Sequence, residues 1–121
     1  MHTWFPLGAV YLALAVAAGA FGAHGLRGRL DAHHLELWET AVRYFVIGGV
    51  ALLAVGLAAG QAASRAWWVP GLLLGAGAAV FSGTVWLLAL GAPRWLGAVT
   101  PLGGVLLIGG FVALAVVAVR R

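Results

Sequence analysis

Residues 67–91 read WWVPGLLLGAGAAVFSGTVWLLALG, a stretch of 25 residues without an acidic, basic or histidine side chain. An α-helix needs about 20 apolar residues to cross a hydrocarbon core about 30 Å thick, so this stretch is long enough to span a membrane. Three further apolar stretches cover residues 4–23, 41–60 and 98–119. The sequence therefore predicts an all-α, polytopic membrane protein, with four transmembrane helices forming one domain over residues 1–121.

The composition supports a membrane environment. The chain is 64% hydrophobic and 8% charged, whereas soluble domains have about 25% charged residues with which to cover their surface. The net charge of +4 comes from arginines at the edges of the apolar stretches. This placement is typical of orientation in anionic lipid, so membrane lipids are the expected partners and nucleic acid is not. The absence of cysteine excludes disulfides and thiolate ligands.

The connections between the spans indicate how the helices are arranged. Residues 24–40 are polar, and Asp31 is expected to cap a short amphipathic helix that lies at the membrane interface and runs into the second span. The other connections are short, which predicts an up-down-up-down bundle. Pro93 is expected to stop the third helix, and Trp67 and Trp68 to lie at the headgroup level.

Four spans place both termini on one side of the membrane. Four arginines then lie in connections on the opposite side, against three on the terminal side, so the positive-inside rule decides little. Our expectation is that the termini are cytoplasmic.

Small residues predict how the helices pack. Gly71, Gly75, Ala79 and Gly83 recur every four residues, which indicates one flat groove along the third helix. This groove faces either another helix of the same chain or a second copy. The other expected packing positions are Gly19, Gly22, Gly103 and Gly104.

The topology brings most polar side chains to one membrane face, where they predict a small polar pocket. Ionisable groups near membrane depth are costly to bury and are default candidates for function. The candidate pocket residues are His24, Glu39, Thr40, Arg43, Tyr44, Ser82, Thr84 and Thr100.

Each candidate also has a structural interpretation. His24 is placed either to cap the carbonyl end of the first helix or to act as a ligand or proton relay. Glu39 and Arg43 have the spacing of a helix-surface ion pair. The hydroxyls of Ser82 and Thr84 are expected to bond to carbonyls of their own helix. Thr100, which precedes Pro101, fits the N-cap of the fourth helix.

Neither metal nor catalytic patterns are found. The adjacent His33 and His34 point about 100° apart on a helix and are poor joint ligands. No histidine lies in the middle of a span, where axial haem ligands are expected, so we expect neither metal nor cofactor. There is no serine–histidine–acid order, intramembrane carboxylate pair or phosphate loop, and an enzyme is not expected.

Several motifs carry a resemblance to a known family. They are GAFGAHGL at residues 19–26, TAVRY at 40–44, FSGTVWLLAL at 81–90 and TPLGG at 100–104. With these motifs the chain resembles the YgdD-like family of small membrane proteins, a domain of unknown function. The resemblance implies a four-helix protein of the bacterial inner membrane, with relatives in eukaryotic membranes and no established activity.

The chain departs from the pattern of that family at two positions. After the tyrosine at position 44 the family usually carries glutamine, with histidine four positions beyond the tyrosine. Here these positions hold Phe45 and Gly48. The departure weakens any ligand-binding or proton-relay role for the predicted pocket.

Three functions follow from this reading. The leading hypothesis is a non-enzymatic accessory or scaffold subunit, or a small homo-oligomer, because the packing signals are strong and the chemical ones weak. The main alternative is a small transporter or channel component with a polar path near His24, Ser82 and Thr100. A membrane enzyme acting on lipid would depend only on His24 and Glu39.

Overall fold

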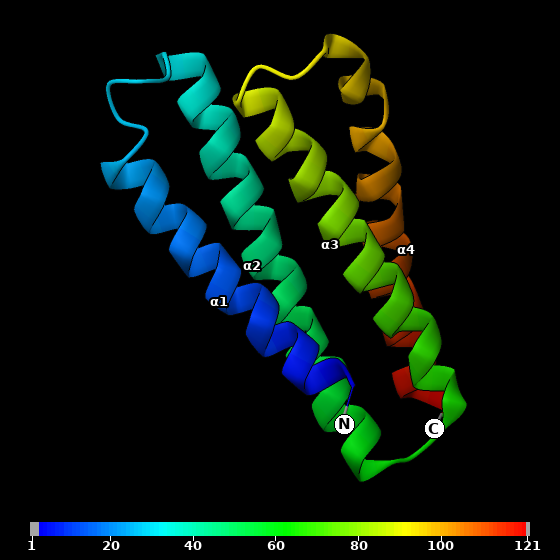
Figure 1. The fold of residues 1–121 in the computed structure, drawn as a ribbon. Helices are drawn as coiled ribbons and strands as arrows, with labels where there is room; N and C mark the ends of the chain where they lie inside the picture. Colours follow the sequence, from blue (N-terminus) through cyan, green and yellow to red (C-terminus); the bar gives the residue numbers. More distant parts are fainter. Residues whose placement is uncertain (1–2, 121) are drawn as a thin grey trace.

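Four long helices follow one another in antiparallel succession (Figure 1). The computed structural model describes residues 3–120. Each of the four helical spans is long and apolar enough to cross a membrane, so the predicted polytopic all-α fold is confirmed. The helices are α1 Trp4–His24, α2 Ala32–Gln61, α3 Trp68–Ala89 and α4 Thr100–Arg120, with short 3₁₀ helices at Arg65–Trp67 and Arg94–Ala98.

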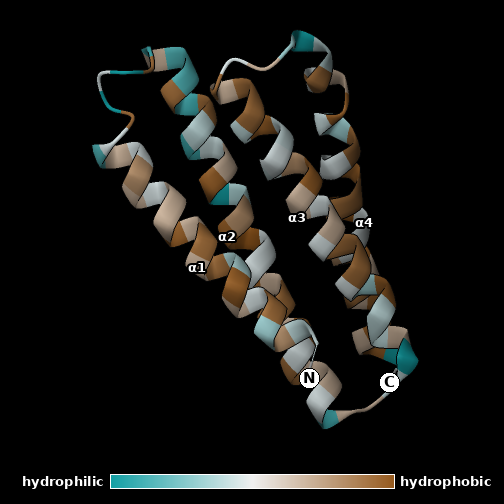
Figure 2. Ribbon diagram, in the orientation of Figure 1, coloured by the Kyte–Doolittle hydropathy of each residue, from teal (hydrophilic) through white to brown (hydrophobic). Residues whose placement is uncertain are grey.

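The bundle has two polar ends. The α1–α2 and α3–α4 connections lie at one end, which we call the loop end. The α2–α3 connection and both ends of the chain lie at the other, the terminal end (Figure 1). Hydrophilic residues gather at these two ends, and the helices between them are mostly hydrophobic (Figure 2). This distribution matches a molecule whose middle lies in hydrocarbon.

The polar segment before the second span is helical, as predicted, but it is not a separate helix. It forms the first turns of α2, which runs without a break from Ala32 to Gln61. Asp31 is the N-cap, as predicted, and its Oδ1 accepts hydrogen bonds from the His34 backbone N–H at 2.8 Å and from the His34 ring at 2.7 Å. These bonds, the backbone one foremost, hold the pKa of the Asp31 carboxyl below its ordinary value.

The ends of α1 and α3 are closed by backbone groups rather than by the expected residues. At α3, Gly91 has a φ of +96°, and the Ala92 N–H reaches back to the Leu87 carbonyl at 2.9 Å. This arrangement is a glycine C-cap of the Schellman type. It ends the helix at Ala89, several residues before Pro93, so the expectation that Pro93 stops the helix is wrong.

The helices pack as a curved row in which each contacts chiefly its neighbours in sequence. The spans of α1 and α4 lie at the two edges of this row (Figure 1), and each has only 17% of its apolar stretch buried. The corresponding shares are 44% for the span of α2 and 39% for that of α3. The two inner helices therefore form the core, and the two outer helices present wide surfaces to their surroundings.

Glycines permit the closest approaches between helices. A Cβ atom added at Gly8 on α1 would lie 2.7 Å from the Gly49 carbonyl oxygen on α2. One added at Gly77 on α3 would lie 2.7 Å from the Leu107 amide nitrogen on α4. Because both obstacles are backbone atoms, a side chain at either position would force the helices apart. Close backbone packing of this kind is how helices associate in lipid, where hydrophobic force between them is weak.

The predicted groove from Gly71 to Gly83 is not formed as one continuous surface. Gly71 packs on the Trp4 ring and Gly75 is buried, but Ala79 is exposed and Gly83 has no atom within 4 Å of an added Cβ. Residues four apart on a helix turn by about 40° per step, so a strip of four such residues drifts by about 120°. The strip therefore leaves the interface before it reaches Gly83.

The other predicted packing positions differ among themselves. An added Cβ at Gly22 would meet the Trp38 ring at 2.5 Å, and one at Gly103 would meet the backbone of Phe81. Gly19 and Gly104 are looser, with nearest atoms at 3.4 Å and 3.9 Å. Gly22 and Gly103 are thus the tight contacts of this group.

Candidate functional site

The hydroxyl of Ser82, the most buried member of the predicted pocket, bonds to another helix. Ser82 is fully buried on α3, and its Oγ donates to the Ala41 carbonyl of α2 at 2.7 Å. The expected bond to a carbonyl of its own helix is not observed. The hydroxyl therefore acts as a link between the two inner helices.

Thr84 and Thr100 form a second link, between α3 and α4. Their hydroxyl oxygens lie 2.7 Å apart. Thr84 also donates to the Val80 carbonyl of its own helix at 2.8 Å, as predicted. A hydroxyl has one donor hydrogen. With Thr84 donating to Val80, Thr100 donates to Thr84, and neither donor remains free.

Thr100 differs from its predicted role. It is the first residue of α4, and the preceding Val99 already has helical angles of −83° and −31°. Its hydroxyl points back toward the Leu96 carbonyl at 3.3 Å and toward Thr84. The interpretation of Thr100 as an N-cap is wrong because the short helix Arg94–Ala98 leads almost directly into α4.

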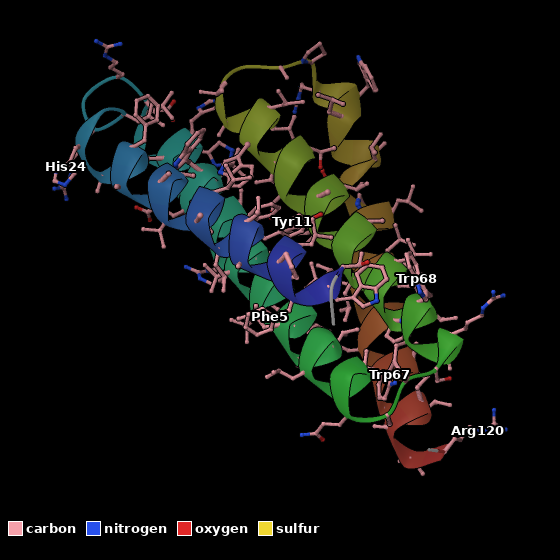
Figure 3. The ribbon with its side chains drawn as sticks, turned by 60° about the horizontal axis from the view of Figure 1, so that its bottom comes forward. Phe5, Tyr11, His24, Trp67, Trp68 and Arg120 are labelled. Carbon is pink, nitrogen blue, oxygen red and sulfur yellow. The ribbon has the colours of Figure 1, made fainter. Side chains whose placement is uncertain are left out.

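The ionisable members of the predicted pocket point outward. His24 is exposed at the end of α1 and projects away from the bundle (Figure 3). Backbone N–H groups of residues 25 and 26 cap this helix end by donating to the Phe21 carbonyl. Glu39 and Arg43 are exposed, and within residues 3–120 they form no ion pair, contrary to expectation. An exposed pair at this spacing contributes less than about 1 kcal/mol, so little energy holds it together.

The last two members, Thr40 and Tyr44, lie on the outward side of α2. Thr40 is half-buried and Tyr44 is exposed, with its ring 4.7 Å from the Phe81 ring. The predicted residues are thus divided between hydroxyls bonded inside the bundle and ionisable groups on its surface. They do not come together as one pocket.

Three aromatic side chains outside the predicted pocket make polar contacts to the backbone. The Tyr11 hydroxyl donates to the Gly75 carbonyl at 2.8 Å, which joins α1 to α3 (Figure 3). Trp38 Nε1 donates to the Ala18 carbonyl of α1 at 2.8 Å, and Trp67 Nε1 donates to a carbonyl at the end of α2. Trp67 lies in the connection between α2 and α3 and is 1% exposed, so its ring packs inside the bundle; its predicted place at the headgroup level stays a prediction.

No sequence signal separates Trp67 from Trp68. They are adjacent and lie at the same end of the bundle as Arg120, far from His24 (Figure 3). Trp68 is 47% exposed, with its ring against that of Trp4 at 4.7 Å, whereas Trp67 turns inward. The direction of each ring depends on the helical phase set by the short helix Arg65–Trp67.

One buried polar atom has no partner. Trp86 Nε1 on α3 is buried and meets no acceptor among the described residues. The Trp86 ring lies among other aromatic rings, 5.1 Å from Phe45 and 5.9 Å from Trp38. These neighbouring rings contact Trp86 closely, but they provide no hydrogen-bond acceptor for its Nε1.

Two cavities lie outside the region of the predicted pocket, except that Tyr44 lines one of them. One, of about 530 Å³, is at the loop end and includes His33, His34 and Arg94 in its walls. Another, of about 410 Å³, is an apolar hollow between α2 and α4 that includes Tyr44 and Phe111. Within residues 3–120, no three histidine, cysteine or acidic side chains come together as a metal site would require.

Comparison with known proteins identifies the family. Residues 18–104 match the family described as "Protein of unknown function (DUF423)", and this match covers most of the chain. The chain belongs to the DUF423 family. The narrower YgdD-like resemblance stays a prediction.

Relatives of this DUF423 member extend over its whole length. A UPF0382 membrane protein of Staphylococcus saprophyticus is 44% identical over 116 residues, which cover 96% of this chain and 96% of the relative. UPF0382 membrane proteins of Staphylococcus epidermidis and Staphylococcus aureus are 42% and 41% identical, over 99% and 96% of this chain and 98% and 94% of theirs. No solved structure matches. The chain is accordingly a multi-pass membrane protein of a family of unknown function.

Proposed function

We propose that the protein is a non-enzymatic membrane scaffold that assembles as a small homo-oligomer through the outward side of α1. The observation that carries this proposal is the difference between the uncovered sides of the two outer helices. One strip on the exposed side of α1 carries Ala9, Ala13, Ala17 and Ala20 around Val16, and the bulkier Val10, Leu14 and Phe21 are exposed beside this strip. Small side chains allow the backbones of two membrane helices to approach closely.

The uncovered side of α4 is different in kind. Its glycines at positions 103 and 110 are already packed on α3. Most side chains that remain exposed are branched and bulky, among them Leu102, Val105, Ile108 and Val112, with Ala115 as a small one. Such a surface is typical of contact with lipid chains, since most of it offers no close backbone approach. The two outer helices therefore favour different neighbours, a second copy for α1 and lipid for α4.

The chemistry of the interior also supports a scaffold rather than a transporter. A polar path near His24, Ser82 and Thr100 would need hydroxyls that face water. Ser82 instead donates to a buried carbonyl, Thr100 is bonded to Thr84, and His24 lies outside the bundle. The transporter alternative therefore has less support than the scaffold.

Native mass spectrometry of the protein in lipid nanodiscs tests the proposal. The wild type is expected as a dimer or larger oligomer, and Ala13→Leu is expected to shift it to monomer without lowering its thermal stability. Ala115→Leu, the same substitution on the exposed side of α4, is the matched control and is expected to leave the oligomer intact. A monomeric wild type, or an oligomer that survives Ala13→Leu, would refute the proposal.

The proposed location is the bacterial inner (plasma) membrane, with both termini in the cytoplasm. Support comes from the two termini lying at one end of the bundle (Figure 1) and from the staphylococcal relatives, which are named as membrane proteins. A reporter that functions only in the cytoplasm is expected to be active when it is fused to the C-terminus. Activity of a reporter that functions only outside the cytoplasm would reverse the assignment.

A further inference from the structure

The cavity of about 530 Å³ at the loop end brings together two segments that are far apart in the sequence. One wall is the first turn of α2, with His33, His34 and Leu37, and the other is the end of α3 and the connection that follows it, with Leu88 and Arg94. These segments lie side by side at the loop end (Figure 1). The cavity has a volume of about 530 Å³, which is within the size range of small-ligand sites, about 300–1,000 Å³.

Nitrogen donors dominate the polar part of the cavity. The Arg94 guanidinium is a permanent cation with several N–H groups. The rings of His33 and His34 lie next to one another, with centroids 5.4 Å apart. No carboxylate is among the lining residues. Arginine and histidine without a competing acid favour an anion with several oxygens.

One carboxylate contacts a residue of the cavity wall. Asp31 accepts from the His34 ring Nδ1 at 2.7 Å and from the His34 backbone N–H at 2.8 Å. An ionised carboxylate only accepts hydrogen bonds, so Nδ1 of His34 carries the hydrogen. The contact holds the ring of His34 in place at the cavity wall. Nε2 is its other polar atom, and it donates to an anion only when both ring nitrogens carry a hydrogen. Asp31 therefore orients the ring of His34 and compensates the charge of that ring when it is protonated, which leaves Arg94 as the permanent cation of the cavity.

The remaining walls are apolar or open. Leu37 and Leu88 are half-buried, and both line the cavity below its charged groups in the direction of the helical spans. Gly91 and Gly97 also line it, and a Cβ at either would meet no atom within 4 Å, so the rim is wide. The neighbouring Trp95 is 66% exposed at this end. A cationic rim above apolar walls, at the end of a membrane span, matches the level of lipid headgroups.

We propose that this cavity is a phosphate-binding site, in which Arg94 and the two histidines hold the phosphate ester of a phospholipid headgroup. Leu37 and Leu88 then contact the glycerol and the first methylenes of its acyl chains. Free phosphate has the same chemistry as the headgroup but makes no use of the apolar walls. The expected preference is therefore for the lipid, and the site would anchor one lipid at the loop end of each chain.

Binding measurements on the full chain in a non-ionic detergent test this proposal. The probes are dioleoyl phosphatidylglycerol, dioleoylglycerol with the same chains but no phosphate, and inorganic phosphate. Native mass spectrometry is expected to show saturable binding of one phosphatidylglycerol and no comparable binding of dioleoylglycerol. Loss of a charge-assisted hydrogen bond costs about 1.5–3 kcal/mol, so Arg94→Gln is expected to raise the Kd at least about tenfold.

Matched variants separate this site from general electrostatic attraction. Arg29→Gln removes the same charge from the same end of the molecule but not from the cavity wall, and it should change the Kd less than about twofold. Arg94→Lys retains the charge and should recover part of the affinity. If inorganic phosphate displaces the lipid from the wild type but not from Arg94→Gln, the cavity is a phosphate site whose ligand is free phosphate from solution. Equal lipid affinity in Arg94→Gln and Arg29→Gln, or equal binding of dioleoylglycerol, would overturn the proposal.

Discussion

Gly77→Ala is the substitution for which the structure makes the sharpest prediction. A Cβ at this position would lie 2.7 Å from the Leu107 amide nitrogen and 3.0 Å from both the Gly103 carbonyl oxygen and the Leu106 carbonyl carbon. All three obstacles are backbone atoms of α4. No rotamer change relieves such a contact, so α4 has to move away from α3 along this part of the interface.

The size of the effect follows from the displacement. The 2.7 Å contact is about 0.7 Å shorter than the 3.4 Å at which ordinary van der Waals contact begins. Overpacking of this kind costs about 1–3 kcal/mol. Alanine is a better helix former than glycine by up to about 1 kcal/mol in water. That gain is smaller in lipid, where the unfolded helices stay helical. We expect Gly77→Ala to lower the free energy of unfolding by about 1–3 kcal/mol.

Gly83→Ala provides the control on the same helix. Its added Cβ meets no atom within 4 Å, so we expect a change of less than about 0.5 kcal/mol. Both variants are compared with the wild type by reversible unfolding in mixed micelles with increasing sodium dodecyl sulfate, followed by far-UV circular dichroism and tryptophan fluorescence. If both variants unfold at the same detergent fraction as the wild type, the α3–α4 contact described above does not limit the approach of these helices.

Three other predictions concern polar contacts. Ser82→Ala should lower the free energy of unfolding by about 0.6–1.7 kcal/mol, the range of interhelix hydrogen bonds in membranes, measured by the same titration. Trp86→Phe removes a buried donor that has no partner, whereas Trp38→Phe loses a hydrogen bond to α1. Trp86→Phe should therefore change the free energy of unfolding less than Trp38→Phe. The reverse order would contradict the hydrogen bonding described for these two rings. The pKa of Asp31 is lower in the folded state than in the unfolded state. Its contribution to the free energy of unfolding is therefore present above the ordinary pKa of about 4 and is lost as the pH falls through the lower pKa of the folded state. The NMR chemical shift of the His34 backbone amide should therefore change as the pH falls through the lowered pKa of Asp31. In Asp31→Asn this change should be absent.

Local patterns were sufficient for the positions of the helices. The stretch of residues 67–91 is apolar all round, and such a stretch is helical in lipid because every backbone group has to be bonded internally. The cap at Asp31 was equally readable, since it depends on residues three apart. The end of α3 was misjudged because Gly91 closes the helix before Pro93 is reached.

The candidate site was much less predictable. Ser82 and Thr84 are two residues apart, and the hydroxyl of each has a carbonyl within reach on its own helix. Only Thr84 uses that carbonyl, while Ser82 faces α2 and bonds to it. The choice depends on which side of α3 meets a neighbour. The cavity around Arg94 was missed for the same reason, since one wall comes from the start of α2 and the other from the end of α3 and the connection that follows it.

By itself, the sequence determined the solvent of this protein, the number of its spans and their antiparallel order, because hydropathy and connection length are local properties. The tertiary structure alone decided which small residues pack against a neighbour, which tryptophan turns inward and which polar groups meet. These outcomes depend on helical phase, which drifts by about 40° between residues four apart. They depend equally on the placement of the helices in a row, which leaves α1 and α4 with most of their surface uncovered.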